Sequence, residues 1–140
     1  MKEYSAWHGA WAAIPTPFRD DLSLDLDALR RHVSFLCRHN IDGIVACGTT
    51  GEAATLTQEE KRIVIETVLD AVAGAVPVIA GVGTNDTRTT IENAKMAQSA
   101  GAAGLLVVTP YYNKPNQEGL YRHFTSVANA VALPQIVYVV

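Results

Sequence analysis

The sequence predicts an α/β fold, in which a parallel β-sheet alternates with helices along the chain. Five short apolar runs start about 30 residues apart, which is the length of one βαβ unit. The runs do not alternate apolar with polar residues, as expected for parallel strands that are buried on both faces. With 140 residues and no linker or low-complexity segment, residues 1–140 are predicted to form a single domain.

The predicted strands are rich in Val, Ile, Leu and Ala, and all but the last end in loops of Gly, Thr or Pro. They cover residues 10–14, 43–47, 76–80, 104–108 and 135–140. Together with the four helical stretches between them, they give five strands and four helices in strict alternation.

Each intervening stretch has the period of a helix with one apolar face. Asp25 is a candidate N-cap for the first helix, and Thr57 with Glu60 forms a capping-box pattern before the second. The third helix is expected to open at Asn85, Asp86 or Thr87. The fourth is predicted from the apolar stripe Leu120, Phe124, Val127 and Val131.

The pattern leaves open whether the sheet closes into a barrel. A (β/α)8 barrel usually needs roughly 200–250 residues, and this chain has 140. On length alone, an open five-stranded doubly wound sheet is the better fit. In either architecture the loops that follow the strands meet at one end of the sheet, where the site is expected.

Charge and cysteine content exclude several function classes. Eleven Lys and Arg against fourteen Asp and Glu give a net charge of −3, which argues against nucleic-acid binding. No apolar run reaches the roughly 18 residues that span a membrane. Two cysteines cannot make a disulfide scaffold, so we expect a cytoplasmic protein.

The four histidines lack metal-ligand spacing, so we expect no metal and place them at the surface or at helix ends.

Two loops and one strand end carry the candidate functional residues. In Gly48-Thr49-Thr50-Gly51-Glu52, glycines on both sides of two hydroxyls predict exposed N–H groups that could cradle a carboxylate or phosphate. An ordinary turn whose threonines cap the next helix is the alternative. Tyr111 and Tyr112 are adjacent, so only one is expected to face the home pocket. Tyr138 ends an apolar strand, where it is either a site residue or a core tyrosine.

A dinucleotide site is a weaker interpretation of the loop after the third predicted strand. Gly81-x-Gly83 begins like the fingerprint of such sites, but Asp86 stands where its third glycine belongs.

These segments together resemble the dihydrodipicolinate synthase / N-acetylneuraminate lyase family of class I aldolases. The resemblance runs from about Gly9 to Tyr138, nearly the whole chain. Its matching segments are Ile14-Pro15-Thr16-Pro17-Phe18, Gly48-Thr49-Thr50-Gly51-Glu52, Pro77-Val78-Ile79-Ala80-Gly81, Thr109-Pro110-Tyr111-Tyr112-Asn113-Lys114-Pro115 and Leu133-Pro134-Gln135-Ile136-Val137-Tyr138. Within the family, the two threonines and the tyrosine pair are most similar to the 4-hydroxy-tetrahydrodipicolinate synthase branch.

The resemblance implies the first five strands and four helices of a (β/α)8 TIM barrel, truncated. It implies a lyase of lysine and diaminopimelate biosynthesis that condenses pyruvate with aspartate semialdehyde, without a cofactor. By position, Thr49, Tyr112 and Tyr138 match a proton-relay triad, and Tyr138 also holds the pyruvyl group. Gly48, Thr49 and Thr50 match the loop that binds the pyruvate carboxylate. The family also implies a homodimer or homotetramer at full length, with Tyr112 reaching the neighbouring subunit's site.

The chain departs from the family pattern because the Schiff-base lysine and strands six to eight lie outside its 140 residues. None of Lys2, Lys61, Lys95 and Lys114 lies in an apolar strand, where desolvation could lower its pKa. We therefore expect the isolated chain to be inactive. Three alternatives stay open: a non-catalytic fragment or association module, another pyruvate-dependent aldolase of the family, or an open-sheet binding protein for small anions.

Overall fold

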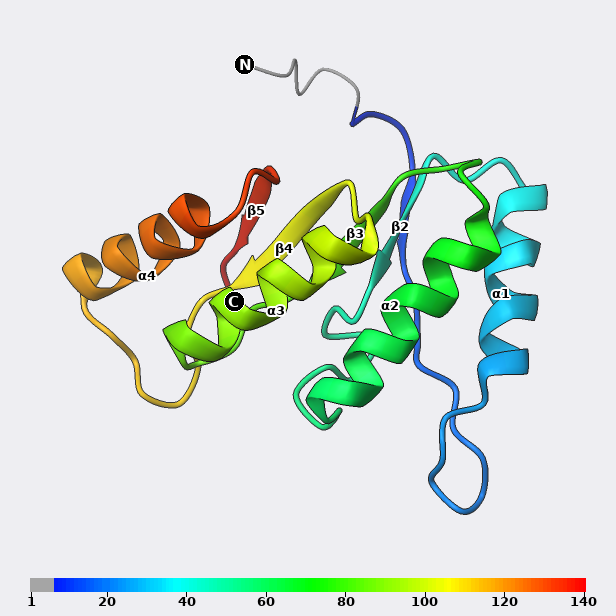
Figure 1. The fold of residues 1–140 in the computed structure, drawn as a ribbon, viewed down its shortest axis with the longest axis horizontal. Helices are drawn as coiled ribbons and strands as arrows, with labels where there is room; N and C mark the ends of the chain where they lie inside the picture. The colour runs from blue at the N-terminus through cyan, green and yellow to red at the C-terminus, as the bar shows by residue number, and fades with distance from the viewer. Residues whose placement is uncertain (1–6) are drawn as a thin grey trace.

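The computed structural model describes residues 7–140 and contains five strands alternating with four helices (Figure 1). In chain order these are β1 (Trp11–Ala13), α1 (Leu26–Arg38), β2 (Gly43–Ala46), α2 (Gln58–Val72), β3 (Val78–Gly81), α3 (Thr87–Ala100), β4 (Gly104–Val108), α4 (Gln117–Ala130) and β5 (Gln135–Tyr138). The number, type and order of the predicted elements are confirmed.

The strands form one parallel sheet in the order β1-β2-β3-β4-β5. Because every crossover steps in the same direction with the usual right hand, the helices are expected on one face of the sheet. Figure 1 shows them there, with each helix beside the next. The doubly wound alternative is wrong, because a doubly wound sheet reverses its strand order. Consecutive neighbours are instead the arrangement of a (β/α)8 barrel.

The helix starts are set by local capping hydrogen bonds. Asp25 caps α1 by accepting from the Ala28 N–H at 2.8 Å, and Thr57 with Glu60 forms the complete capping box of α2. Of the three candidates for α3, Asp86 is the cap. Asn116 caps α4 through the N–H of Gly119. The caps of α1 and α2 were predicted because a cap depends on residues three positions apart, whereas α3 was left with three candidates and no cap was predicted for α4.

The core lies between the sheet and the four helices. Leu29 and Val33 of α1 and Val64 and Val68 of α2 are almost fully buried. Strands β2, β3 and β4 are largely buried, as predicted. Burial on both faces is wrong for the two edge strands, since Ala13 of β1 is exposed, as are Ile136 and Val137 of β5. The edge strands β1 and β5 each have one neighbouring strand in this sheet.

The histidines do not all lie at the surface or at helix ends. His39 is the C-cap of α1, a helix end as predicted. His123 is buried in α4, which contradicts the prediction, and its Nδ1 lies 2.9 Å from the Thr87 hydroxyl. In residues 7–140 no three His, Cys, Asp or Glu side chains gather to hold a metal ion. No helix there combines the length and apolar character needed to cross a bilayer.

Candidate active site

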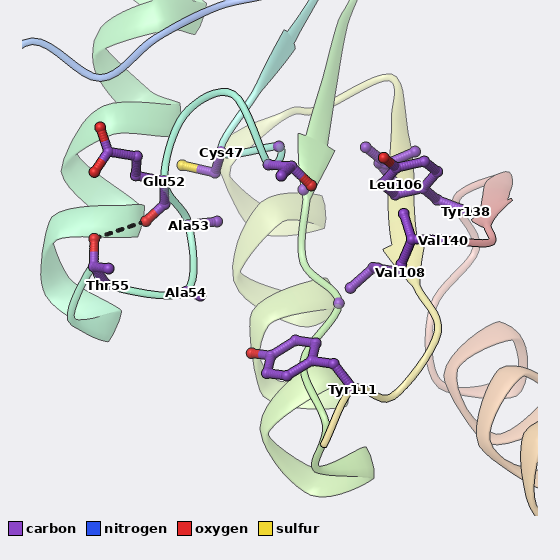
Figure 2. Close-up of a pocket in the computed structure, with 14 residues that line it drawn as sticks. Cys47, Glu52, Ala53, Ala54, Thr55, Leu106, Val108, Tyr111, Tyr138 and Val140 are labelled. Carbon is purple, nitrogen blue, oxygen red and sulfur yellow. Dashed lines mark hydrogen bonds between the residues drawn. The ribbon is translucent and has the colours of Figure 1, made fainter. Parts of the chain in front are cut away.

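A pocket of about 430 Å³ lies at the carboxyl ends of β2 to β5 (Figure 2). Parallel α/β folds place their sites at this end. Three of the predicted site residues line it, namely Gly48, Thr49 and Tyr138. The remaining lining comes from Cys47, Glu52, Ala53, Ala54, Thr55, Gly81, Gly83, Leu106, Val108, Tyr111 and Val140.

The loop after β2 makes a tight turn, although not by the expected route. The N–H of Gly51 donates to the Gly48 carbonyl at 3.1 Å, and the N–H of Glu52 donates to the Thr49 carbonyl at 3.0 Å. Cys47 and Glu52 take the left-handed conformation, with φ of 55° and 53°. Gly48 and Gly51 do not, so the left-handed residues of this turn are not the glycines on which its exposed N–H groups were predicted.

The tip of this loop presents hydrogen-bond donors that no other described residue uses. Within residues 7–140, the backbone N–H groups and hydroxyls of Thr49 and Thr50 make no hydrogen bond, and both residues are exposed. The alternative in which these threonines cap the next helix is wrong, because Thr57 caps α2. Thr50 is not among the residues that line the pocket. The loop can offer N–H and O–H donors to an anion in or beside the pocket.

Of the neighbouring Tyr111 and Tyr112, only one lines the pocket, as predicted. Tyr111 lines the pocket, whereas the Tyr112 side chain is 93% exposed and lies outside it. Tyr138 is half-buried at the end of β5, and Figure 2 shows its ring beside Leu106 and Val140. The structure therefore brings Thr49 and Tyr138 to one pocket and places Tyr112 apart from them.

Gly81 and Gly83 let the loops close tightly around the pocket. A Cβ on Gly81 would lie 1.9 Å from the Cys47 carbonyl oxygen, and a Cβ on Gly83 would lie 2.4 Å from the Val108 nitrogen. The Gly-x-Gly signal therefore marks close approach between neighbouring strand ends. The sequence analysis noted Gly81 and Gly83 as a weak dinucleotide signal and Gly81 as part of a family segment, but it did not predict this close approach.

Buried groups beside the loop include one thiol and one lysine that sequence reasoning did not link. Burial raises the pKa of the Cys47 thiol to about 12, so the sulfur is protonated at neutral pH. Lys61 of α2 is 8% exposed, and burial lowers its pKa. The Cys47 Sγ lies 3.9 Å from the Lys61 carbonyl oxygen, yet Lys61 does not line the pocket.

The other described lysines also lie away from the pocket. Lys95 and Lys114 are exposed, and Lys2 lies outside the described residues. Within residues 7–140, no lysine lines the pocket.

Comparison with known proteins finds relatives that all belong to one family. The model of the dihydrodipicolinate synthetase family matches residues 6–140. The 4-hydroxy-tetrahydrodipicolinate synthase of Pelobacter propionicus is 52% identical over 130 residues, which cover 93% of this chain and 44% of the relative. The synthase of Acidothermus cellulolyticus is 55% identical over 126 residues, covering 90% of this chain and 41% of that protein. The chain thus spans less than half the length of these relatives.

Solved structures agree with the sequence comparison. A crystal structure of dihydrodipicolinate synthase matches this chain with a TM-score of 0.93 and 48% identity. The match covers 96% of this chain and 46% of the chain in that structure. The chloride-inhibited enzyme of Acinetobacter baumannii, complexed with pyruvate, gives a TM-score of 0.93 at 46% identity. That match covers 94% of this chain and 45% of the other. The architecture is that of the first five strands and four helices of a (β/α)8 barrel. The chain belongs to the dihydrodipicolinate synthetase family.

Proposed function

We propose that these residues form the N-terminal part of a 4-hydroxy-tetrahydrodipicolinate synthase, which condenses pyruvate with aspartate semialdehyde. The observation that carries the proposal is that the N–H and hydroxyl groups of Thr49 and Thr50 have no partner among the described residues and lie at or beside a pocket that Tyr138 also lines. Identities of 48–55% to synthases over at least 90% of the chain support the same reaction.

In this proposal the loop after β2 binds the carboxylate of pyruvate. The N–H groups of Thr49 and Thr50 donate to the carboxylate oxygens, and the Thr50 hydroxyl adds a third donor. Hydrogen bonds to an ionised acceptor are stronger than neutral ones. Since no acceptor within the described residues uses these donors, an anion can bind them without displacing a protein group.

Thr49, Tyr138 and Tyr112 then form a hydroxyl relay. A hydroxyl can donate and accept at once, so a series of them can move a proton without a permanent charge. Tyr138 and Thr49 line the same pocket, which supports their part in the relay. Tyr112 lies outside that pocket, so we propose that it completes the relay of a second copy across a dimer interface.

The reaction also needs a lysine that forms a Schiff base with pyruvate. No lysine lines the pocket within residues 7–140. We therefore propose that the 140-residue chain by itself binds the carboxylate and does not turn over.

Titration of the 140-residue chain with pyruvate, followed by amide NMR, tests the carboxylate site. We expect the largest shift changes at the Thr49 and Thr50 amides, with none at the Ser99 amide on the exposed end of α3. Acetone, which has the ketone but no carboxylate, is the matched ligand and should leave both threonine amides unchanged. Equal shifts with acetone, or none with pyruvate, would remove the carboxylate site from the proposal.

Another pyruvate-dependent aldolase of the family is the second candidate function. One structural neighbour, YagE of E. coli K12, is a prophage protein of the dihydrodipicolinic acid synthase family solved in complex with pyruvate, and it is 35% identical to this chain. Its pyruvate is compatible with either reaction. The choice of aldehyde, aspartate semialdehyde or another, separates the two candidates.

An association module is a further candidate, favoured by the exposed apolar residues of β5. Native mass measurement separates a monomer from an edge-paired assembly.

A further inference from the structure

The loop between β4 and α4 holds Tyr112 in a strained turn. The Asn113 N–H donates to the Tyr111 carbonyl at 2.9 Å, and Tyr112 between them has a φ of 71°. A bond between residues two apart around a positive φ is the rarer and more strained form of the γ-turn. Lys114 also has a positive φ, of 43°. Two side-chain-bearing residues in left-handed conformations need an outside contact to hold them.

The side chain of Asn113 supplies such a contact. Its Nδ2 donates to the carbonyl oxygen of Asn85 at 3.1 Å, joining the β4–α4 loop to the β3–α3 loop. Within residues 7–140, this is the one hydrogen bond that ties residues 111–114 to another part of the chain. Asn113 therefore closes the turn with its backbone and anchors it with its side chain.

The acceptor of this bond belongs to a firmly held loop. Thr84 is buried, its N–H donates to the Thr90 hydroxyl at 3.0 Å, and its own hydroxyl donates to the Asp86 carbonyl at 2.9 Å. Thr90 and Asn93 of α3 are also buried, and Asn93 donates to the Val82 carbonyl. The Asn85 carbonyl lies between Thr84 and Asp86, which these hydrogen bonds hold in place. It is therefore a well-ordered acceptor for the Asn113 side chain.

We propose that Asn113 is a positioning residue that sets the direction of the Tyr112 hydroxyl. The inference rests on the proposed function, in which Tyr112 belongs to the relay. Asn113 acts through the turn and is not itself a catalytic residue. Without its side-chain bond, the strained turn relaxes and Tyr112 samples other directions.

Fluorine NMR of the 140-residue chain labelled with 3-fluorotyrosine tests this role. The Tyr112 signal is assigned by its loss in Tyr112→Phe. In Asn113→Ala, and in the near-isosteric Asn113→Asp, which lacks the donor, the Tyr112 signal should move and narrow, because its exposed ring turns more freely once the turn relaxes, while the Tyr138 signal stays. Hydrogen exchange at the residue-113 amide should be about 3- to 10-fold faster, the loss expected for one net hydrogen bond.

Asn85→Ala is the matched control, because it removes a side chain from the same contact but keeps the backbone carbonyl that accepts the bond. It should leave the Tyr112 signal and the amide exchange unchanged. An unmoved Tyr112 signal in both Asn113 variants would overturn the proposal, as would an equal movement in Asn85→Ala. Neither readout needs turnover, so this result and the test of the proposed reaction stand independently.

Discussion

Close backbone contacts beside the site depend on single residues from separate strands. Cys47 turns left-handed at the end of β2, and its carbonyl oxygen occupies the space where a side chain on Gly81 would lie. The sequence identified both segments as loops after strands, because their composition is local information. It could not identify this contact, because the register of β2 against β3 brings the two residues together from 34 positions apart.

Gly81→Ala should therefore destabilise the protein, because the added Cβ would lie 1.9 Å from the Cys47 oxygen and 2.9 Å from the Gly48 nitrogen, both backbone atoms. Overpacking of this kind costs about 1–3 kcal/mol. Gly48→Ala is the control, since its Cβ would meet only side chains at 3.6 Å and 3.7 Å. Urea denaturation of both variants measures the difference. Equal losses of unfolding free energy would contradict this account of Gly81.

His123 should make stability depend on pH. Burial lowers its pKa, with a smaller opposing effect from Asp86, and its buried Nε2 has no hydrogen-bond partner within residues 7–140. Below the unfolded pKa of about 6.5, the unfolded chain binds more protons at this position than the folded chain. The contribution of neutral His123 is thus present above that pH and is lost as the pH falls.

Urea denaturation at pH 7 and pH 5 tests this dependence. The free energy of unfolding should fall toward pH 5, and the fall should be smaller in His123→Gln. His8→Gln, at an exposed position, is the control and should keep the parent's fall. An identical fall in His123→Gln would show that other groups cause the pH dependence.

At the scale of elements, helix starts were predictable and strand edges were not. Thr57 and Glu60 define the start of α2 from four consecutive residues, and the structure has the same capping box. The apolar composition of 135–140 predicted a strand buried on both faces, yet Ile136 and Val137 are exposed. Amino-acid composition shows whether a strand could be buried. Whether it is buried depends on the strands and helices that pack against it.

Thr57→Ala should cost about 1 kcal/mol of unfolding free energy, within a usual range of about 0.5–2 kcal/mol. The substitution removes the hydroxyl that accepts from the Glu60 N–H at 3.2 Å and donates to the Glu60 carboxylate at 2.9 Å. Gln58→Ala, one residue into the helix and exposed, is the control and should change stability by less than about 0.5 kcal/mol. Chemical denaturation measures both, and a neutral Thr57→Ala would contradict the role of the cap.

At the scale of the whole molecule, the chain length led to a wrong prediction of the strand order. A chain of 140 residues favoured an open doubly wound sheet, but the observed order follows the chain without a reversal. The family resemblance gave the barrel topology because it compares whole segments with folded relatives. Length alone cannot do this when a chain spans about 44% of those relatives.

Borohydride treatment of the 140-residue chain with pyruvate should leave no trapped adduct. Burial lowers the pKa of Lys61, but Lys61 does not line the pocket. Mass measurement after proteolysis detects a pyruvyl-sized addition at any lysine. If an adduct forms and disappears in Lys61→Met, Lys61 is a nucleophile and the proposal that the chain does not turn over by itself must be revised.

The central claim is that Tyr138 and the loop after β2 serve a synthase, and turnover in a chimera tests it most directly. In the chimera, this chain replaces the matching N-terminal region of the Pelobacter propionicus synthase, to which it is 52% identical over 130 residues. We predict condensation of pyruvate with aspartate semialdehyde, and a loss of about 10²- to 10⁴-fold in kcat for Tyr138→Phe. Tyr121→Phe, on the exposed face of α4, should keep the parent's rate. A folded chimera without condensation, or a Tyr138→Phe variant that turns over at the parent's rate, would contradict the account.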